Sequence, residues 1–312
     1  MSASTATATI VTAESNAAAE RPAAAHPPYI GRFAPSPTGA LHLGSLLAAL
    51  GSFLDARARG GRWLVRMEDL DRERVVPGCA AQMLKTLEAF GLHWDDAVEY
   101  QSARTEHYVR ALARLQAAGL TFECSCSRRE LADEGGYPGT CRAGPRGAGP
   151  TATRFRVAAR RVALLDRVQG ACEFELAERG DVIVRRRDGV YAYQLAVVVD
   201  DAAQKVTDVV RGADLLDSTP WQIALQEALH VPPVGYAHLP LLTEPDGAKL
   251  AKSRRTIALD PAQAPALLCR TLRLLRQAPP AKLELEPVRI ILEWAIQHWR
   301  IAELQDVREV RV

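Results

Sequence analysis

The chain has 312 residues, of which 48% are apolar and 24% charged, so it can bury a full core and should hold two domains or one domain with an insertion. No segment has an uninterrupted apolar run of membrane length, which argues against a protein that spans a membrane. The net charge is only +2, so overall charge does not indicate a nucleic-acid binder, although local arginine clusters could still meet phosphate.

Residues 1–28 are rich in Ala, Thr and Ser and lack both a basic start and a continuous apolar stretch. We therefore expect a disordered tail rather than a secretory signal, and a soluble cytoplasmic protein.

Residues 29–61 predict a strand, a glycine-containing turn and a helix. A short run with β character stops at a Pro/Ser/Thr/Gly turn, and leucines then recur at helical spacing from Leu43 to Leu54. Such a turn gathers free backbone N–H groups at the positive end of a helix dipole, which suits phosphate. Gly39 and Gly44 allow close approach, and His42 lies where it could donate to a phosphate. An ordinary strand–helix corner with a surface histidine is the alternative.

Residues 62–67 read as the next strand, which makes a parallel βαβ unit the expectation. Its carboxyl edge carries Glu68, Asp69 and Asp71, with arginines nearby to offset their repulsion. Segments 79–90 and 103–118 have helical periodicity and end at glycines, so we expect helices packed outside the sheet.

A cysteine-bearing segment follows, with Cys124, Cys126 and Cys141. Three thiolates can face one metal from turns, but tetrahedral zinc needs a fourth ligand. Tyr137 is unusual chemistry for that position, and His107 or water are the generic candidates. Three reduced cysteines without metal are the alternative.

Short antiparallel strands are expected at 154–157, 172–176 and 181–184. The run from 189 to 201 is continuously apolar and ends in two acids, which we interpret as a buried strand that resumes the sheet, and residues 206–214 repeat this arrangement. A helix from 217 to 230 and a strand from 236 to 242 lead to a loop with Lys249 and Lys252. Residues 257–312 are helical in pattern. Two lysines that bracket a small turn can clamp a triphosphate, although lone lysines are usually solvated.

The segment Pro35-Ser-Pro-Thr-Gly-Ala-Leu-His42-Leu-Gly44-Ser45 resembles the HIGH signature of class I aminoacyl-tRNA synthetases, and Lys249-Leu-Ala-Lys-Ser253 resembles their KMSKS loop. Arg32-Phe-Ala-Pro-Ser36 and Arg66-Met-Glu68-Asp69-Leu-Asp71 are similar to the glutamyl branch. The short chain and the pattern Cys-x-Cys, Tyr-x-x-x-Cys resemble the glutamyl-Q tRNA(Asp) synthetases, truncated paralogues of glutamyl-tRNA synthetase. Two positions depart from the signatures: Ser45 replaces the last His of HIGH, and Ala251 replaces the first Ser of KMSKS.

The resemblance implies a set of site residues. His42 and Lys252 would act on the phosphates; ATP would also meet Gly39, Gly44, Lys249 and Ser253. Glutamate would bind Arg32, Phe33, Ala34, Pro35, Ser36, Glu68, Tyr193 and Arg211, with Glu68 on its ammonium. Cys124, Cys126, Tyr137 and Cys141 would hold a structural Zn²⁺, and Mg²⁺ would accompany ATP.

We therefore expect an α/β fold: a doubly wound, Rossmann-like parallel sheet with a zinc-bearing α+β insertion and a short helical C-terminal region. The expected boundaries are 1–28 for the tail, 29–119 and 188–256 for the two halves of the catalytic domain, 120–187 for the insertion and 257–312 for the helical region, with no anticodon-binding domain.

The implied activity is ATP-dependent, tRNA-independent activation of L-glutamate and transfer of glutamate to queuosine in the anticodon of tRNA(Asp). We expect a monomer with no membrane partner. One alternative is a short enzyme that charges the 3′ end of tRNA(Glu). Others are an inactive RNA-binding paralogue and an adenylate-forming ligase that does not use tRNA.

Overall fold

The computed structural model describes residues 28–127, 130–131, 136–243 and 257–312. Within these ranges no helix combines the length and apolar character that crossing a bilayer requires. The central strands are parallel: β1 (Ile30–Phe33) pairs with β2 (Arg62–Met67), and β2 pairs with β3 (Glu99–Tyr100). Next to β1, the pair β9 (Asp208–Gly212) and β10 (Gly235–Leu239) is also parallel. The predicted mixed α/β fold with parallel strands is confirmed.

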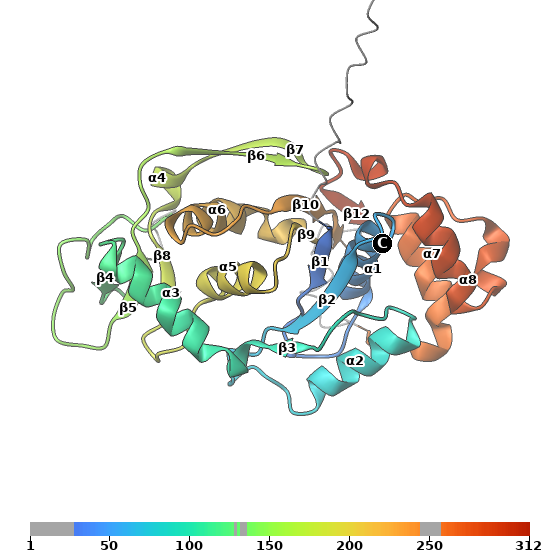
Figure 1. Ribbon diagram of the computed structural model, residues 1–312, viewed down its shortest axis with the longest axis horizontal. Coiled ribbons are helices and arrows are strands. Elements are labelled where there is room, and N and C mark those ends of the chain that lie inside the picture. Colours follow the sequence, from blue (N-terminus) through green and yellow to red (C-terminus); the bar gives the residue numbers. More distant parts are fainter. Residues whose placement is uncertain (1–27, 128–129, 132–135, 244–256) are drawn as a thin grey trace, which may run out of the picture.

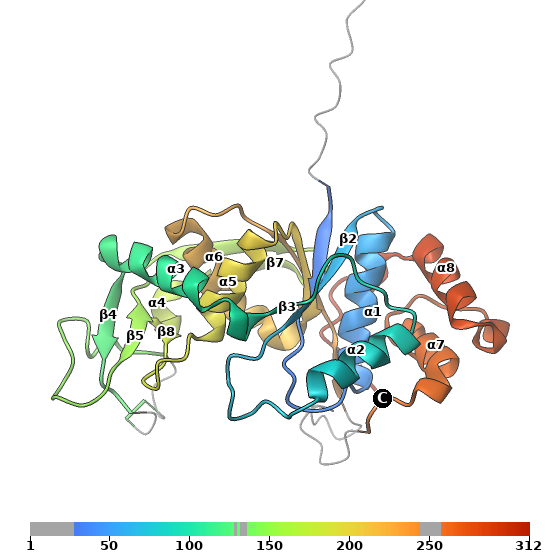
Figure 2. The same ribbon diagram turned by 60° about the horizontal axis from the view of Figure 1, so that its bottom comes forward.

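The first βαβ unit forms as the sequence predicts. Helix α1 (Leu43–Arg57) follows β1 and buries Leu46, Leu47, Leu50 and Leu54 against the sheet. Helices α2 (Cys79–Ala89) and α3 (Thr105–Ala117) coincide with the two predicted helical segments. Figures 1 and 2 both place α1 on one side of β1 and β2, with helices α5 (Tyr193–Ala203) and α6 (Thr219–Ala228) on the other.

The expectation of a strand over 189–201 is wrong, because this segment forms α5. A helix buried on most sides reads as a continuous apolar run, and such a run has no period that separates it from a buried strand. The helix begins at Tyr193 and carries Asp200 and Asp201 near its end, both buried. The two acids therefore meet the interior rather than a sheet edge.

The described strands between residues 121 and 185 form two antiparallel groups. The first contains β4 (Thr121–Cys124), β5 (Ala152–Phe155) and β8 (Val182–Arg185); the second is the hairpin of β6 (Arg161–Asp166) and β7 (Gly170–Glu175), with the short helix α4 (Leu176–Arg179) after it. The turn of this hairpin reaches back to the parallel strands: Val168 belongs to the main core, and Gln169 Nε2 donates to the His238 carbonyl at 2.8 Å.

The last part of the chain packs on α1. Helices α7 (Ala264–Leu274) and α8 (Val288–His298) contribute Leu268, Leu272 and Ile291 to the same core as α1. Strand β12 (Glu309–Arg311) pairs in parallel with β11 (Leu241–Thr243), the strand that precedes the predicted lysine loop. The C-terminal residues thus support the end of the predicted nucleotide site.

Candidate active site

The turn between β1 and α1 lines a cavity of about 690 Å³, here called the turn cavity. Its wall includes Thr38, Gly39, His42 and Gly44, and the opposite side is formed by Gly212, Asp214 and β11 residues. The predicted residues Pro35 and Ser36 also line this cavity. A Cβ placed at Gly39 would meet nothing within 4 Å, so backbone there is open to a ligand.

His42 is the N-cap of α1, and its ring can be assigned one tautomer. Its Nδ1 accepts hydrogen bonds from the backbone N–H groups of Gly44, at 3.1 Å, and Ser45, at 3.3 Å. Burial also lowers the pKa of His42, which favours the neutral ring. Because Nδ1 is an acceptor, the proton lies on Nε2, which is therefore available as a donor to an anion in the turn cavity.

Two neighbours fix this histidine. The Ser45 side chain accepts from the His42 backbone N–H at 2.7 Å, which completes a capping box. A Cβ at Gly44 would lie 3.0 Å from the His42 ring, so glycine gives the ring its room. Sequence reasoning noted Ser45 only as a departure from the HIGH signature and missed that it orients His42.

A smaller cavity of about 130 Å³, the arginine cavity, adjoins the turn cavity and shares Phe33, Ala48 and Gly212 with it. It brings together residues from five separate segments. Its lining includes the predicted residues Arg32, Phe33, Ala34, Glu68, Tyr193 and Arg211.

All five N–H groups of Arg211 have partners. Nη1 donates to Gln222 Oε1 at 2.8 Å and to the Tyr193 hydroxyl at 3.2 Å. Nη2 donates to Thr219 Oγ1 at 2.8 Å and to the Leu215 carbonyl at 3.5 Å. The two longest of these contacts involve Tyr193 and Leu215, which line the cavity, so a carboxylate can replace them without breaking the shorter internal bonds.

The fifth N–H of Arg211 donates to His238, which is paired with Asp166. Sequence reasoning missed this buried His–Asp pair. Arg211 Nε donates to His238 Nε2 at 3.0 Å, and His238 Nδ1 lies 2.6 Å from Asp166 Oδ2. His238 must be neutral, with its proton on Nδ1, to accept from Arg211. Burial lowers its pKa against the opposing effect of Asp166. Asp166 lies in the β6–β7 hairpin, far from Arg211 in sequence, and no sequence motif indicates that the two are linked through His238.

The other side of the arginine cavity rests on a buried ionic network. Asp201 Oδ1 accepts from Arg32 Nε at 3.2 Å and from Arg66 Nη2 at 2.8 Å. Burial alone would raise the pKa of Asp201, but these two guanidinium groups outweigh it and hold the pKa below its usual range. The two acids at the end of the apolar run were the only sequence signal for this network.

Glu68 lies beside this network without a full partner of its own. Its Oε1 is 3.7 Å from Arg66 Nη2, while Arg66 Nη2 makes its short contact with Asp201. Burial raises the pKa of Glu68 to about 7, opposed by Arg66 and Arg32. A cation that enters the cavity would favour the ionised form. The cavity therefore presents one carboxylate and two arginines to a ligand.

The predicted metal ligands also come together. The sulfur atoms of Cys124, Cys126 and Cys141 lie within 4.8 Å of one another, and the Tyr137 hydroxyl is 3.5 Å from Cys124 Sγ. Tetrahedral zinc with Zn–S bonds of about 2.3 Å requires sulfur separations of roughly 3.8 Å. Three thiols and one phenol at this spacing fit a closed zinc site. His107, the other generic candidate, is not part of the cluster.

Lys249, Lys252 and Ser253 lie outside the described residues. The structure describes the strand that leads to them, β11, which borders the turn cavity through Leu241 and Leu242, and the chain after them, where the Leu259 N–H donates to the Leu41 carbonyl at 2.9 Å.

Comparison with known proteins identifies the class of enzyme to which the chain belongs. Residues 30–267 match the family described as tRNA synthetases class I (E and Q), catalytic domain. A solved glutamate-tRNA synthetase from Elizabethkingia anophelis has a similar fold, with a TM-score of 0.73 and 23% sequence identity; the match covers 92% of this chain and 68% of that one.

Curated relatives narrow the assignment. The chain is 53% identical over 276 residues to a glutamyl-Q tRNA(Asp) synthetase from Pseudomonas fluorescens, covering 88% of this chain and 93% of the relative. Proteins of the same name from Dechloromonas aromatica and Pseudomonas syringae pv. tomato are 53% and 50% identical, and the latter match covers 92% of this chain and 99% of the relative. The chain belongs to the glutamyl-Q tRNA(Asp) synthetase family, as its signatures predicted.

Proposed function

We propose that this chain is an ATP-dependent ligase that activates L-glutamate to glutamyl-adenylate and transfers the glutamate to queuosine in the anticodon of tRNA(Asp). Family membership supports the reaction, and the arginine cavity is the observation that supports glutamate as the substrate. Glutamate has two carboxylates and one ammonium, and the cavity offers Arg32, Arg211 and Glu68 to match them, with Tyr193 as a further donor.

The side-chain carboxylate distinguishes glutamate from glutamine. An arginine that faced a neutral amide would lose a charge-assisted bond, so glutamine should bind less well. Which arginine takes which carboxylate is left open by this argument. Pro35 and Ser36, also proposed for glutamate, border the turn cavity and would meet the reacting end of the amino acid.

Activation then requires positioning rather than a side-chain nucleophile. The glutamate α-carboxylate attacks the α-phosphate of ATP, the bond to the β-phosphate breaks, and pyrophosphate leaves. We place ATP in the turn cavity, where Gly39, Gly44 and the helix entrance offer backbone N–H groups and His42 offers its Nε2 proton. Lys249, Lys252 and Ser253 would close on the phosphates, and Mg²⁺ would enter with ATP.

We further propose that Cys124, Cys126, Tyr137 and Cys141 hold a structural zinc ion. A closed set of four ligands leaves no open position for chemistry, so the metal would stabilise the segment that contains β4.

Two assays test the reaction. Glutamate-dependent exchange between pyrophosphate and ATP should proceed without tRNA, should fail with glutamine, and should be abolished in Lys252→Ala. Labelled glutamate should transfer to tRNA(Asp) that contains queuosine and not to the same tRNA without it. Exchange unchanged in Lys252→Ala would refute the role of that lysine.

The position of the label separates the alternatives. Glutamate on the terminal adenosine would identify a short enzyme that charges the 3′ end, and the absence of any exchange would identify an inactive RNA-binding paralogue.

A further inference from the structure

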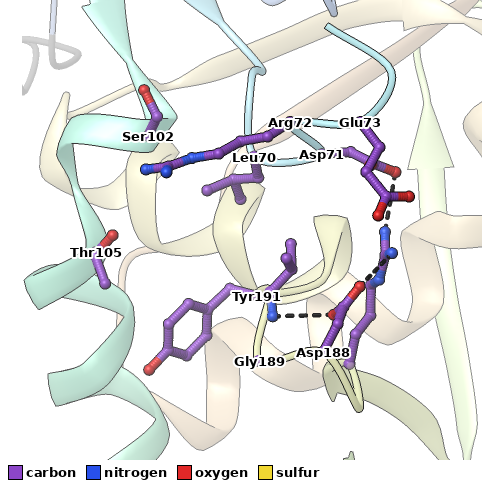
Figure 3. A pocket seen from close by; sticks show the side chains of 11 residues that line it. Leu70, Asp71, Arg72, Glu73, Ser102, Thr105, Asp188, Gly189 and Tyr191 are labelled. Atoms are coloured by element: carbon purple, nitrogen blue, oxygen red, sulfur yellow. Dashed lines mark hydrogen bonds and ion pairs between the residues drawn. The ribbon is translucent and has the colours of Figure 1, made fainter.

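A third cavity, of about 440 Å³, is formed by three separate segments and is shown in Figure 3. We call it the loop cavity. One wall is the loop after β2, from Leu70 to Glu73; a second is the start of α3, with Ser102 and Thr105. The third is the turn from Arg186 to Tyr191, between β8 and α5.

Among the described residues, the loop cavity has no lining residue in common with the two reactant cavities, but its lining lies next to theirs along the chain. Glu68 lines the arginine cavity, residues 70–73 line the loop cavity, and Arg74 lines the turn cavity. Tyr191 lines the loop cavity, and Tyr193 lines the arginine cavity. Because two residues of extended chain span at most about 7 Å, the linings of the three cavities lie close together along this loop. The acyl-adenylate forms where the first two cavities join, so the third is placed to bring in a second substrate.

Hydrogen bonds and ion pairs between the three segments hold the walls of the loop cavity in place. Asp69 accepts hydrogen bonds from the Ser102 backbone N–H at 2.8 Å and from its hydroxyl at 2.6 Å. Asp71 accepts from Arg186 Nη1 at 2.9 Å, and Arg186 also binds Asp188. These pairs join all three segments, which makes the cavity preorganised.

Four polar side chains of the lining make no hydrogen bond or ion pair with any described residue: Arg72, Glu73, Thr105 and Tyr191. Arg72 and Glu73 are exposed. In Figure 3 the Arg72 side chain extends toward Ser102, and the Tyr191 ring lies toward Thr105. Leu70, Val190 and the Tyr191 ring supply apolar surface beside these polar groups. This combination suits a planar, polar group such as a nucleoside.

We propose that the loop cavity binds the acceptor nucleoside, queuosine, during glutamate transfer. Of the three carboxylates in the lining, Asp71 is paired with Arg74 and Arg186, and Asp188 with Arg186, which leaves Glu73 as the carboxylate that makes no ion pair with a described residue. An unpaired carboxylate favours a base that carries an ammonium group, as the queuosine side chain does, over the uncharged base of a terminal adenosine. Glu73 is the carboxylate that meets the ammonium, and Tyr191 donates to a hydroxyl of the nucleoside. The proposal rests on the proposed function, because it names the site of the second half-reaction.

The test separates activation from transfer. Glu73→Gln and Tyr191→Phe change one functional group each, and Glu88→Gln is the control, because Glu88 is exposed on α2 away from the cavity lining. In Glu73→Gln we expect kcat/KM for transfer to queuosine-containing tRNA(Asp) to fall about tenfold or more, as loss of a hydrogen bond to a charged group implies. Tyr191→Phe should fall less, and the control should match the parent.

Pyrophosphate exchange should stay within about twofold of the parent in all three variants, and this retained exchange also shows that each variant is folded. Free queuosine nucleoside should inhibit transfer by the parent competitively with tRNA and should inhibit Glu73→Gln at least about tenfold more weakly.

Unchanged transfer in both cavity variants would overturn the proposal, as would a loss of exchange that parallels the loss of transfer, since the cavity would then serve activation. Glutamate found on the terminal adenosine would refute queuosine as the occupant of the loop cavity. A parent protein without glutamate-dependent exchange would instead refute the proposed function itself.

Discussion

Glu68 links the chemistry of the amino-acid site to pH. The pKa of this buried carboxyl is about 7, raised from its ordinary value of 4.5, so the unliganded side chain is largely neutral at pH 6 and ionised at pH 8. The proposed contact of Glu68 with the ammonium of glutamate needs the ionised form. We therefore expect the Kd for glutamate to rise about tenfold between pH 8 and pH 6, and glutamate binding near pH 6.5 to release a proton.

Calorimetry in two buffers of different ionisation enthalpy measures that proton directly. Glu68→Gln should bind weakly and lose the pH dependence. The same residue affects folding with a fixed sign: because its folded pKa is raised, its contribution to the free energy of unfolding falls as pH rises from about 4.5 to about 7 and is constant above that range. A Kd that does not change over this range would contradict the assignment of Glu68 to the ammonium.

In the proposed site His238 would act on glutamate through Arg211, so replacing it should affect glutamate more than ATP. His238→Phe removes the acceptor for Arg211 Nε and leaves the guanidinium less well oriented. We expect the KM for glutamate in pyrophosphate exchange to rise about tenfold, which is the effect of losing one hydrogen bond to a charged group. The KM for ATP should not change. His238→Gln offers an amide oxygen in the same region and should recover part of the loss. Equal effects on both substrates would indicate a folding defect instead.

At the scale of elements, the sequence predicts local units better than long-range contacts. The β1–α1–β2 unit could be predicted because leucine spacing, the turn residues and Gly60-Gly61 all act within 33 residues. Helix α5 could not, because its apolar faces match neighbours that come from β8, α3 and α6, and its sequence alone suits either a buried strand or a buried helix.

The candidate site shows the same division. Arg32 and Glu68 could be named because they fall in motifs of the family, and Tyr193 and Arg211 because the resemblance to the family implies them. The groups that hold them, Asp201, Gln222 and His238, lie in no motif, and their contacts with the site residues appear only when the chain is folded.

The cysteine cluster is an element whose effect should be local. Hydrogen bonds from Ser125 and Cys126 outweigh burial and lower the pKa of Cys141 to about 6, whereas burial and the neighbouring thiols raise the pKa of Cys126 to about 11. Zinc must displace protons from such groups, so zinc retention should weaken as pH falls. Cys141→Ser should lower bound zinc from about one equivalent to near zero by elemental analysis and make residues 124–141 sensitive to protease.

Cys172→Ser is the matched control and should retain zinc, since Cys172 is not part of the cluster. Figures 1 and 2 both place β4 at the end of the molecule opposite α8, with β1 between them, so pyrophosphate exchange should change little in protein that stays folded. Equal zinc contents in the two variants would exclude these ligands.

At the scale of the whole molecule, Asp55 joins four distant parts of the chain. It lies on α1 and is 1% exposed, and it accepts hydrogen bonds from Tyr29 before β1, Arg167 in the β6–β7 hairpin and Trp299 after α8. Burial would raise its pKa, but the contacts with Arg167 and Tyr29 outweigh this and lower it. The insertion and the C-terminal helices are thereby attached to the parallel strands at one buried carboxylate.

Asp55→Asn keeps the size of this side chain and removes its charge, which leaves Arg167 without its closest anion. Loss of one partner of a buried ion pair typically costs about 3–5 kcal/mol, so we expect Tm to fall by several degrees, measured by calorimetry. Glu173→Gln removes half of the exposed pair with Arg161, in which both side chains are more than 60% exposed, and should change the free energy of unfolding by less than about 1 kcal/mol.

The lowered pKa of Asp55 determines how its contribution to stability changes with pH. Its stabilising contribution is present above its unfolded pKa, near 3.8, and is lost as pH falls through the folded value. The difference in stability between the parent and Asp55→Asn should therefore be full at neutral pH and shrink in acid. Since Asp55 touches neither reactant cavity, the variant should retain its KM for glutamate below its melting temperature. A Tm shift no larger than that of Glu173→Gln would mean that the parts are held together by their apolar contacts alone.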